Sequence, residues 1–265
     1  MHLTITHVTE YAYDQPVVYA LQKVRLRPQS SVMQQVADWA LEIDGGRVEV
    51  SYTDHYGNHL DLVSAEPGTQ SMTLTARGVV DTHDRNGILG PVYGRAPLWH
   101  FRQATAMTTA GPDIADLART VGAAASPVEG LHALSAAILE RVPYEIGQTT
   151  ADSTAEDAMR IGRGVCQDHA NIFIAAARHA GLPARYVSGY LLMTDRVDQD
   201  ASHAWAEAHV DGLGWVGFDV SNGISPDEKY VRIAIGRDAR DAAPVSGLRM
   251  GVAAESMIVS LQVQQ

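Results

Sequence analysis

The sequence contains a single cysteine, Cys166, which excludes an internal disulfide and any metal cluster built from several cysteines. Basic residues are also scarce: 20 Lys and Arg stand against 31 Asp and Glu, a formal net charge of −11. An acidic chain without a basic stripe is not attracted to nucleic acid or to anionic lipid, so neither is expected as a partner. No apolar run approaches the length of about 18 residues that a membrane span needs, and the N-terminus lacks the features of a signal peptide. A cytoplasmic protein is therefore expected.

The first hundred residues show mostly alternating apolar positions. Leu3 and Ile5, Val24 and Leu26, and Val48 and Val50 each share one parity, which is typical of strands with one buried face. Turn-forming runs such as Asp44-Gly45-Gly46 and Glu66-Pro67-Gly68 separate these strands. Residues 1–100 are therefore predicted to form a β-rich domain, an antiparallel sandwich.

The pattern changes after Trp99. Apolar residues then recur at helical spacing, and the helices are expected near residues 113–121, 131–138, 154–159 and 166–179. Strand-like runs follow at residues 184–192, 203–210, 214–220, 230–235 and 257–263. Helices followed by strands indicate an α+β domain rather than an alternating parallel sheet, and its predicted bounds are residues 101–265.

Cys166 is predicted to begin a helix directly after Arg163-Gly164-Val165. The unpaired N–H groups of a helix N-terminus favour a thiolate and can stabilise a developing oxyanion. A lone cysteine is usually a buried structural thiol in apolar surroundings, but polar Gln167 and Asp168 follow this one. The position therefore favours a nucleophile.

His203 and Asp219 supply the partners that a cysteine nucleophile needs. His203 begins a strand-like run after a polar loop, and Asp219 ends the next run. Asp219 lies 16 residues after His203, which is far enough for a hairpin to place the two side chains together. The carboxylate would then fix the tautomer of the imidazole and stabilise its charged form.

Three separated blocks resemble a known family. GVCQDHANIFIAAARHAGLPARYVSGYL and SHAWAEAHVDGLGWVGFDVSNG resemble the transglutaminase-like core of bacterial cysteine hydrolases, and VRIAIGRDARDAAPVSG resembles their C-terminal strand and loop. HLTITHVTEYAYDQPV and LQKVRLRPQS resemble the β-rich domain that precedes this core. The resemblance implies a papain-like α+β fold with Cys166 as nucleophile, His203 as general acid and base, and Asp219 as the orienting carboxylate. Many members are expected to have Pro-Thr after the aspartate, where this chain has Val220-Ser221.

The implied reaction is the cleavage of an amide, in a peptide or in a glutamine side chain, through a thioester on Cys166, without a cofactor. The backbone N–H of Cys166 and a second donor, Tyr144 or Gln148, would hold the oxyanion. Hydrolysis by a cysteine protease or amidase is the preferred hypothesis, because water needs no dedicated amine site. Transfer to an amine, as in a transglutaminase, remains open, since it would use the same triad.

Two further alternatives belong to other classes of protein. One is a non-catalytic binding module on the same fold, which loss of a triad residue would indicate; no such loss is found. The other is a metal hydrolase, which would use His203, His209 and the acidic loop containing Asp195, Asp198 and Asp200. On a strand, however, His203 and His209 would stand about 20 Å apart, too far for one metal ion to bridge without a sharp bend.

Overall fold

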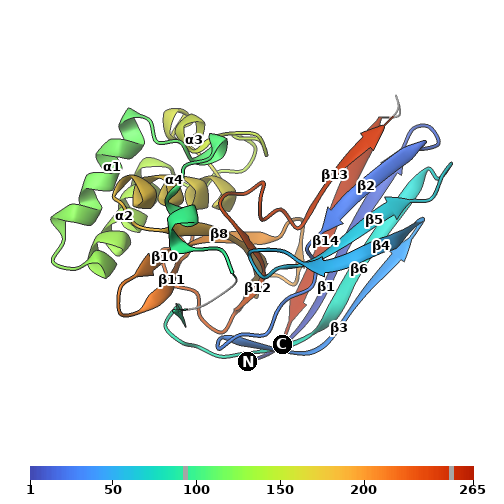
Figure 1. Cartoon of the computed structure of the whole chain (residues 1–265), viewed down its shortest axis with the longest axis horizontal. Coiled ribbons are helices and arrows are strands. Elements are labelled where there is room, and N and C mark those ends of the chain that lie inside the picture. The colour runs from blue at the N-terminus through green and yellow to red at the C-terminus, as the bar shows by residue number, and fades with distance from the viewer. Residues whose placement is uncertain (92–94, 251–253) are drawn as a thin grey trace.

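Two lobes make up the structure, a computed structural model that describes residues 1–91, 95–250 and 254–265 (Figure 1). One lobe consists of two stacked antiparallel sheets, and the other packs helices against a third sheet. The mixed α+β fold predicted from the sequence is confirmed. No helix among the described residues is long and apolar enough to cross a membrane.

The first lobe is a sandwich of a five-stranded and a four-stranded sheet. The five-stranded sheet has the order β3-β6-β1-β14-β9, and the four-stranded sheet has the order β13-β2-β5-β4. The strands before residue 83 are β1 (His2–Tyr13), β2 (Tyr19–Val24), β3 (Gln34–Asp44), β4 (Gly46–Thr53), β5 (His59–Ala65) and β6 (Ser71–Thr82).

Alternating burial along β1, β2, β5 and β6 fills the space between the two sheets. The buried face expected for Val48 and Val50 on β4 is not found: the register shifts between them, and both are exposed. On β1 every second side chain is buried, and Tyr11 and Tyr13 join Val24, Val63 and Leu74 in one apolar cluster. Gly45 has a φ of 71° in the turn between β3 and β4, a left-handed conformation that glycine adopts without a steric cost. The turn predicted at Asp44-Gly45-Gly46 therefore lies between the end of β3 and the start of β4.

Two strands from the end of the chain complete the sandwich. β14 (Glu255–Gln264) pairs with β1 and also with the short β9 (Asp198–Gln199), while β13 (Val245–Met250) pairs with β2. Segments from both sides of residue 100 thus share sheets. The division of the chain into domains at that residue remains a prediction.

The second lobe contains the helices and the third sheet, whose order is β12-β8-β10-β11-β7. Its elements are β7 (Ile88–Gly90), the 3-10 helices η1 (Leu98–Arg102) and η2 (Ala106–Thr108), α1 (Pro112–Ala123), α2 (Pro127–Arg141), α3 (Ala155–Ile161), α4 (Cys166–His179), β8 (Ala184–Leu191), β10 (His203–Val210), β11 (Gly214–Phe218) and β12 (Tyr230–Gly236). Each helix and strand predicted for this half of the chain is present, with ends that differ by a few residues.

Helix α4 is the central helix of this lobe. Its residues from Asp168 to Arg178 are all buried, and four alanines among them allow close packing against β8 and β10. The opposite face of the sheet is covered by an aromatic cluster that contains Phe101, Trp205 and Trp215. Burial on both faces fixes the sheet and the start of α4 relative to each other.

Candidate active site

The site begins at the N-terminus of α4, where Cys166 is the first helical residue and is half-buried. Asp168 caps this end: its Oδ2 accepts hydrogen bonds from the Val165 N–H at 2.8 Å and from the Thr149 hydroxyl at 2.6 Å. A Cβ on Gly164 would lie 2.8 Å from the Cβ of Asp168, so glycine is needed for this close approach. The cap holds the chain on both sides of Cys166 in place.

His203 and Asp219 are brought together by the third sheet. β10 lies between β8 and β11, and His203 is the first residue of β10, while Asp219 follows the last residue of β11. The His203 Nε2 lies 2.6 Å from the Asp219 Oδ2. Because a carboxylate only accepts hydrogen bonds, Nε2 carries a proton and Nδ1 is the ring nitrogen left for another partner. The side chain of Cys166 lies close enough to His203 to favour the charged form of the imidazole and raise its pKa.

Asp219 is fully buried and receives hydrogen bonds from several donors. Besides His203, its Oδ2 accepts from the Asn222 side-chain amide at 2.7 Å and from the Tyr230 hydroxyl at 2.8 Å. Burial by itself would raise the pKa of the Asp219 carboxyl, but these donors favour the charged form, and the net effect is a lowered pKa. Asp219 is therefore a carboxylate at neutral pH.

The charged form of His203 is stabilised in the same way. Burial by itself would lower the pKa of the imidazole, but the hydrogen bonds with Asp219 and Cys166 and the charges of these two groups together raise it to about 10. The imidazole is therefore protonated at neutral pH and is placed to hold a negatively charged sulfur.

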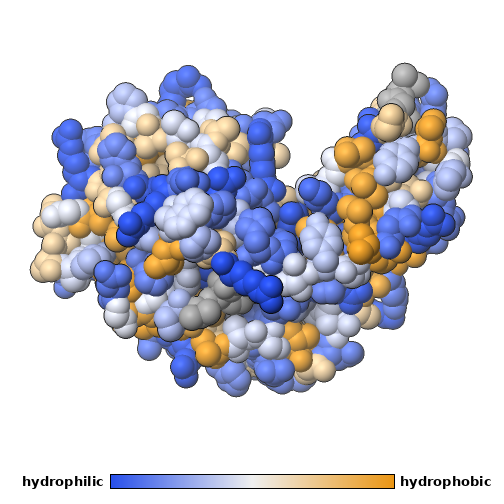
Figure 2. All heavy atoms as spheres, in the orientation of Figure 1, coloured by the Kyte–Doolittle hydropathy of each residue, from blue (hydrophilic) through white to orange (hydrophobic). Residues whose placement is uncertain are grey.

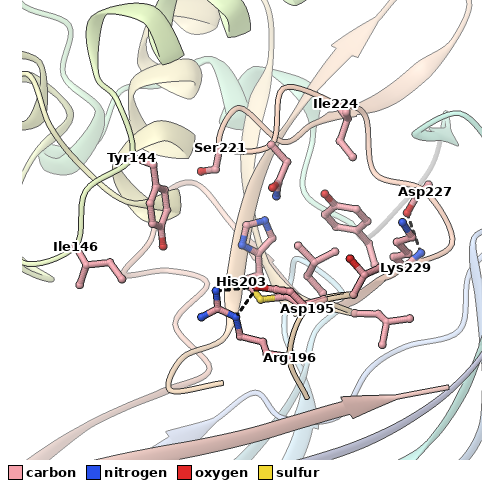
Figure 3. A pocket seen from close by; sticks show the side chains of 15 residues that line it. Tyr144, Ile146, Asp195, Arg196, His203, Ser221, Ile224, Asp227 and Lys229 are labelled. Atoms are coloured by element: carbon pink, nitrogen blue, oxygen red, sulfur yellow. Dashed lines mark hydrogen bonds and ion pairs between the residues drawn. The ribbon is translucent and has the colours of Figure 1, made fainter. Parts of the chain in front are cut away.

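A cavity of about 670 Å³ opens beside His203 (Figure 3). Its wall combines apolar side chains with polar and charged ones; it is formed by Tyr144, Ile146, Leu191, Leu192, Met193, Thr194, Asp195, Arg196, His203, Ser221, Asn222, Ile224, Asp227, Lys229 and Tyr230. A concave site in which apolar side chains surround convergent polar groups is typical of a substrate-binding cleft.

The two candidate oxyanion donors lie in different places. Tyr144 lines the cavity, and burial, followed by the charge of Cys166, raises the pKa of its hydroxyl, which therefore stays protonated. Gln148 is exposed, does not line the cavity, and donates a hydrogen bond to Glu145 at 2.9 Å. Of the two residues that the sequence offered, the structure brings Tyr144 alone to the site.

Sequence reasoning missed Tyr230 and Asn222 as partners of Asp219, and Ser221 as part of the cavity wall. The short polar run Ser221-Asn222-Gly223 could have indicated a turn that returns a side-chain amide to the preceding aspartate. No local signal marks Tyr230, because it reaches Asp219 through the folding of a separate strand.

The residues of the metal alternative do not converge. His203 is bonded to Asp219, whereas the ring of His209 packs against Trp215 with a centroid distance of 5.4 Å. Within residues 1–91, 95–250 and 254–265 no group of three or more His, Cys, Asp or Glu side chains is arranged to hold a metal ion.

Comparison with known proteins gives the class of this chain. Residues 115–220 match the family model of the transglutaminase-like superfamily, and residues 3–81 match the bacterial transglutaminase-like N-terminal region. The chain is thus a transglutaminase-like protein whose core follows a bacterial transglutaminase-like N-terminal region, as the sequence motifs predicted. Membership of this superfamily supports a cysteine-based enzyme.

Similar proteins extend over nearly the whole chain. An uncharacterized protein of Mycobacterium leprae is 27% identical over 274 residues and covers 98% of both chains. An uncharacterized protein of Mycobacterium tuberculosis is 29% identical over 270 residues, which are 92% of this chain and 86% of the relative. Among solved structures, a Cytophaga hutchinsonii protein provisionally named a cysteine protease has a TM-score of 0.78 at 24% identity, covering 100% of this chain and 91% of that one. This likeness shows a shared fold.

Proposed function

We propose that this protein is a cysteine hydrolase that cleaves an amide bond, in a peptide or in a glutamine side chain, through a thioester on Cys166. The observation that carries the proposal is the hydrogen bond between His203 and the buried Asp219, with the half-buried Cys166 close enough to His203 to raise the pKa of the imidazole and with a cavity opening at His203. The name of the Cytophaga hutchinsonii protein, which shares this fold, agrees with a cysteine protease.

In the first half of the reaction the Cys166 sulfur attacks the amide carbonyl and forms an S–C bond. Negative charge then develops on the carbonyl oxygen, where the Cys166 N–H, which has no partner within its helix, and the Tyr144 hydroxyl would donate hydrogen bonds. The proton on His203 Nδ1 moves to the leaving nitrogen, and the C–N bond breaks. A thioester and a free amine result.

In the second half water replaces the amine. His203 is now neutral and has no proton on Nδ1. This nitrogen accepts a proton from water as the water oxygen attacks the thioester carbonyl. The C–S bond breaks, an acid leaves, and the imidazolium and thiolate are restored. Throughout both steps Asp219 stays charged and holds the proton on Nε2.

The direct test is to incubate the protein with a library of peptide amides in water enriched in oxygen-18, in the presence of millimolar putrescine as a competing amine. New carboxylic acids that carry the heavy oxygen, and that are missing with Cys166→Ser, are expected by mass spectrometry. Products joined to putrescine in place of acids would contradict hydrolysis and would favour transfer to an amine. No turnover of any library member would contradict cleavage of these amides.

A further inference from the structure

His169 is a buried histidine beside the site that the reaction above does not use. It lies on α4 one turn after Cys166 and is 1% exposed. Its Nε2 is 2.6 Å from the backbone carbonyl oxygen of Val142, and its Nδ1 is 2.8 Å from the Ser221 Oγ. Both ring nitrogens are thus engaged, one on each side of the ring.

The chemistry of these partners fixes where the protons lie. A carbonyl oxygen only accepts, so Nε2 must donate its proton to Val142. Burial lowers the pKa of His169, so the ring is neutral at neutral pH and Nδ1 has no proton of its own. Nδ1 therefore accepts the hydroxyl proton of Ser221.

The orientation of this hydroxyl matters because Ser221 also lines the cavity, next to His203 and Tyr144 (Figure 3). A serine hydroxyl has one proton and two lone pairs. With its proton held by His169, Ser221 can offer the cavity a hydrogen-bond acceptor but no donor. The neighbouring Asn222 donates its side-chain N–H to Asp219, which holds that side chain against the buried carboxylate.

We propose that Ser221 binds the acyl donor by accepting a hydrogen bond from one of its N–H groups, and that His169 is the positioning residue that keeps the serine oxygen free to accept. The proposal rests on the proposed function, because it names a feature of the substrate of that same cleft. The donor must then be peptide-like, with a backbone N–H near the scissile carbonyl. A donor methylated at that nitrogen binds less well, by about three- to tenfold for one neutral hydrogen bond.

Because Cys166 is the only thiol, its alkylation by peptide-like reagents measures this contact without a known substrate. The probes are N-acetyl-leucyl-alanine chloromethyl ketone and two counterparts, each with one backbone N–H replaced by N–CH3. For each protein, the readout is the ratio of the second-order labelling rates with the parent and the methylated probe. Any change in the nucleophile itself cancels in that ratio.

In the wild type, one of the two methylations should lower the rate about three- to tenfold. The ratio for that probe should fall to near one in Ser221→Ala and stay at the wild-type value in Ser221→Thr, which keeps the hydroxyl. His169→Phe, which keeps Ser221 but removes the acceptor for its proton, should also lower the ratio. Ser64→Ala, on β5 in the sandwich, is the matched control and should keep the ratio of the wild type.

A ratio in Ser221→Ala equal to that of the wild type would overturn the proposal, and so would insensitivity of the wild type to both methylations. These results are separable from a failure of the proposed function. If Ser221 alone is misassigned, the parent probe still labels Cys166 rapidly and His203→Ala still slows it. If labelling is slow and the same in His203→Ala, both the nucleophile and the Ser221 contact are overturned.

Discussion

At the scale of single residues, Asp219 determines the charge of the site. It is completely buried, a condition that favours a neutral carboxylic acid, yet three donors converge on its Oδ2: His203, Asn222 and Tyr230. The donors outweigh burial and lower its pKa. The charge on Asp219 in turn helps to raise the pKa of His203, so the charge of the imidazole depends on the donors that surround Asp219.

Tyr230→Phe removes one of these donors and keeps the ring that packs against Trp205. The pKa of Asp219 should rise, because a hydrogen bond to its charged form is lost. The acid limb of the pH profile of kcat/KM should therefore move to higher pH, and the rate at neutral pH should fall about three- to tenfold. The measurement is the pH profile of hydrolysis, or of Cys166 alkylation by iodoacetamide.

Tyr190→Phe is the control for this change, since Tyr190 donates to no group of the site and its hydroxyl contacts His7 at 3.0 Å. Its acid limb should coincide with that of the wild type. An unshifted limb in Tyr230→Phe would show that the tyrosine does not tune Asp219.

The sequence could supply the three principal residues of the site and little of their surroundings. Cys166, His203 and Asp219 each belong to a motif whose neighbouring residues indicate the start of a helix, the start of a strand or the end of a strand. Tyr230 contacts Asp219, and His169 contacts Ser221, only in the folded chain. No local sequence pattern encodes either contact, because the partners are separated in the sequence. Gln148 illustrates the reverse case: it is polar and lies shortly before the cysteine, but its side chain turns to Glu145.

At the scale of elements, the start of α4 is the part of the fold on which the nucleophile depends. Asp168 is 1% exposed and joins Val165 to the loop that carries Thr149. The sequence predicts a helix start at this position, but the role of Asp168 as a buried cap depends on Thr149, which is 19 residues earlier.

Asp168→Ala should lower the free energy of unfolding by about 1–3 kcal/mol, because the Val165 N–H and the Thr149 hydroxyl both lose their acceptor. It should also slow the alkylation of Cys166, whose backbone the cap holds. Urea denaturation and labelling kinetics measure the two effects. Glu129→Ala is the control, since it removes an exposed carboxylate from the first turn of α2 and should change the free energy of unfolding by less than about 0.5 kcal/mol. An equal loss of free energy of unfolding in both variants would contradict a stabilising role of Asp168.

Elements with long, regular patterns were predicted well, and short ones were missed. The helices and long strands have several apolar repeats each, which is enough for a period to be recognised. β7 and β9 contain three and two residues, too few to show any period, and they exist because neighbouring strands supply their hydrogen-bond partners. β13 was also missed; four of its six residues are Ser246, Gly247, Arg249 and the exposed Leu248, which show no clear alternation.

At the scale of the whole molecule, the chain returns at its end to the strands with which it began. β14 lies between β1 and β9, so it connects the sandwich to the loop whose residues 194–196 line the cavity. One apolar cluster contains Leu3 and Ile5 from β1, Leu261 and Val263 from β14, and Tyr190 from β8. In the space-filling view the two lobes are continuous below and separated by a hollow above (Figure 2).

A fragment of residues 1–100 should therefore not fold cooperatively by itself. It lacks β13 and β14, and Leu3 and Ile5 lose the apolar partners that bury them. Thermal unfolding followed by circular dichroism should show no sharp transition for the fragment and a sharp one for the full chain. A cooperative transition of the fragment would support an independent domain that ends near residue 100.

The most direct test of the ion-paired nucleophile is the rate at which iodoacetamide labels Cys166, followed by intact mass from acidic to alkaline pH. An unassisted thiol gains reactivity as pH rises through about 8.5. Rapid labelling at neutral and lower pH is predicted, with a collapse in His203→Ala and no change in His209→Ala, a histidine at the other end of β10. A thiol that stays inert at neutral pH, or that reacts at the same rate in wild type and His203→Ala, would contradict the proposed nucleophile and favour a binding module on the same fold.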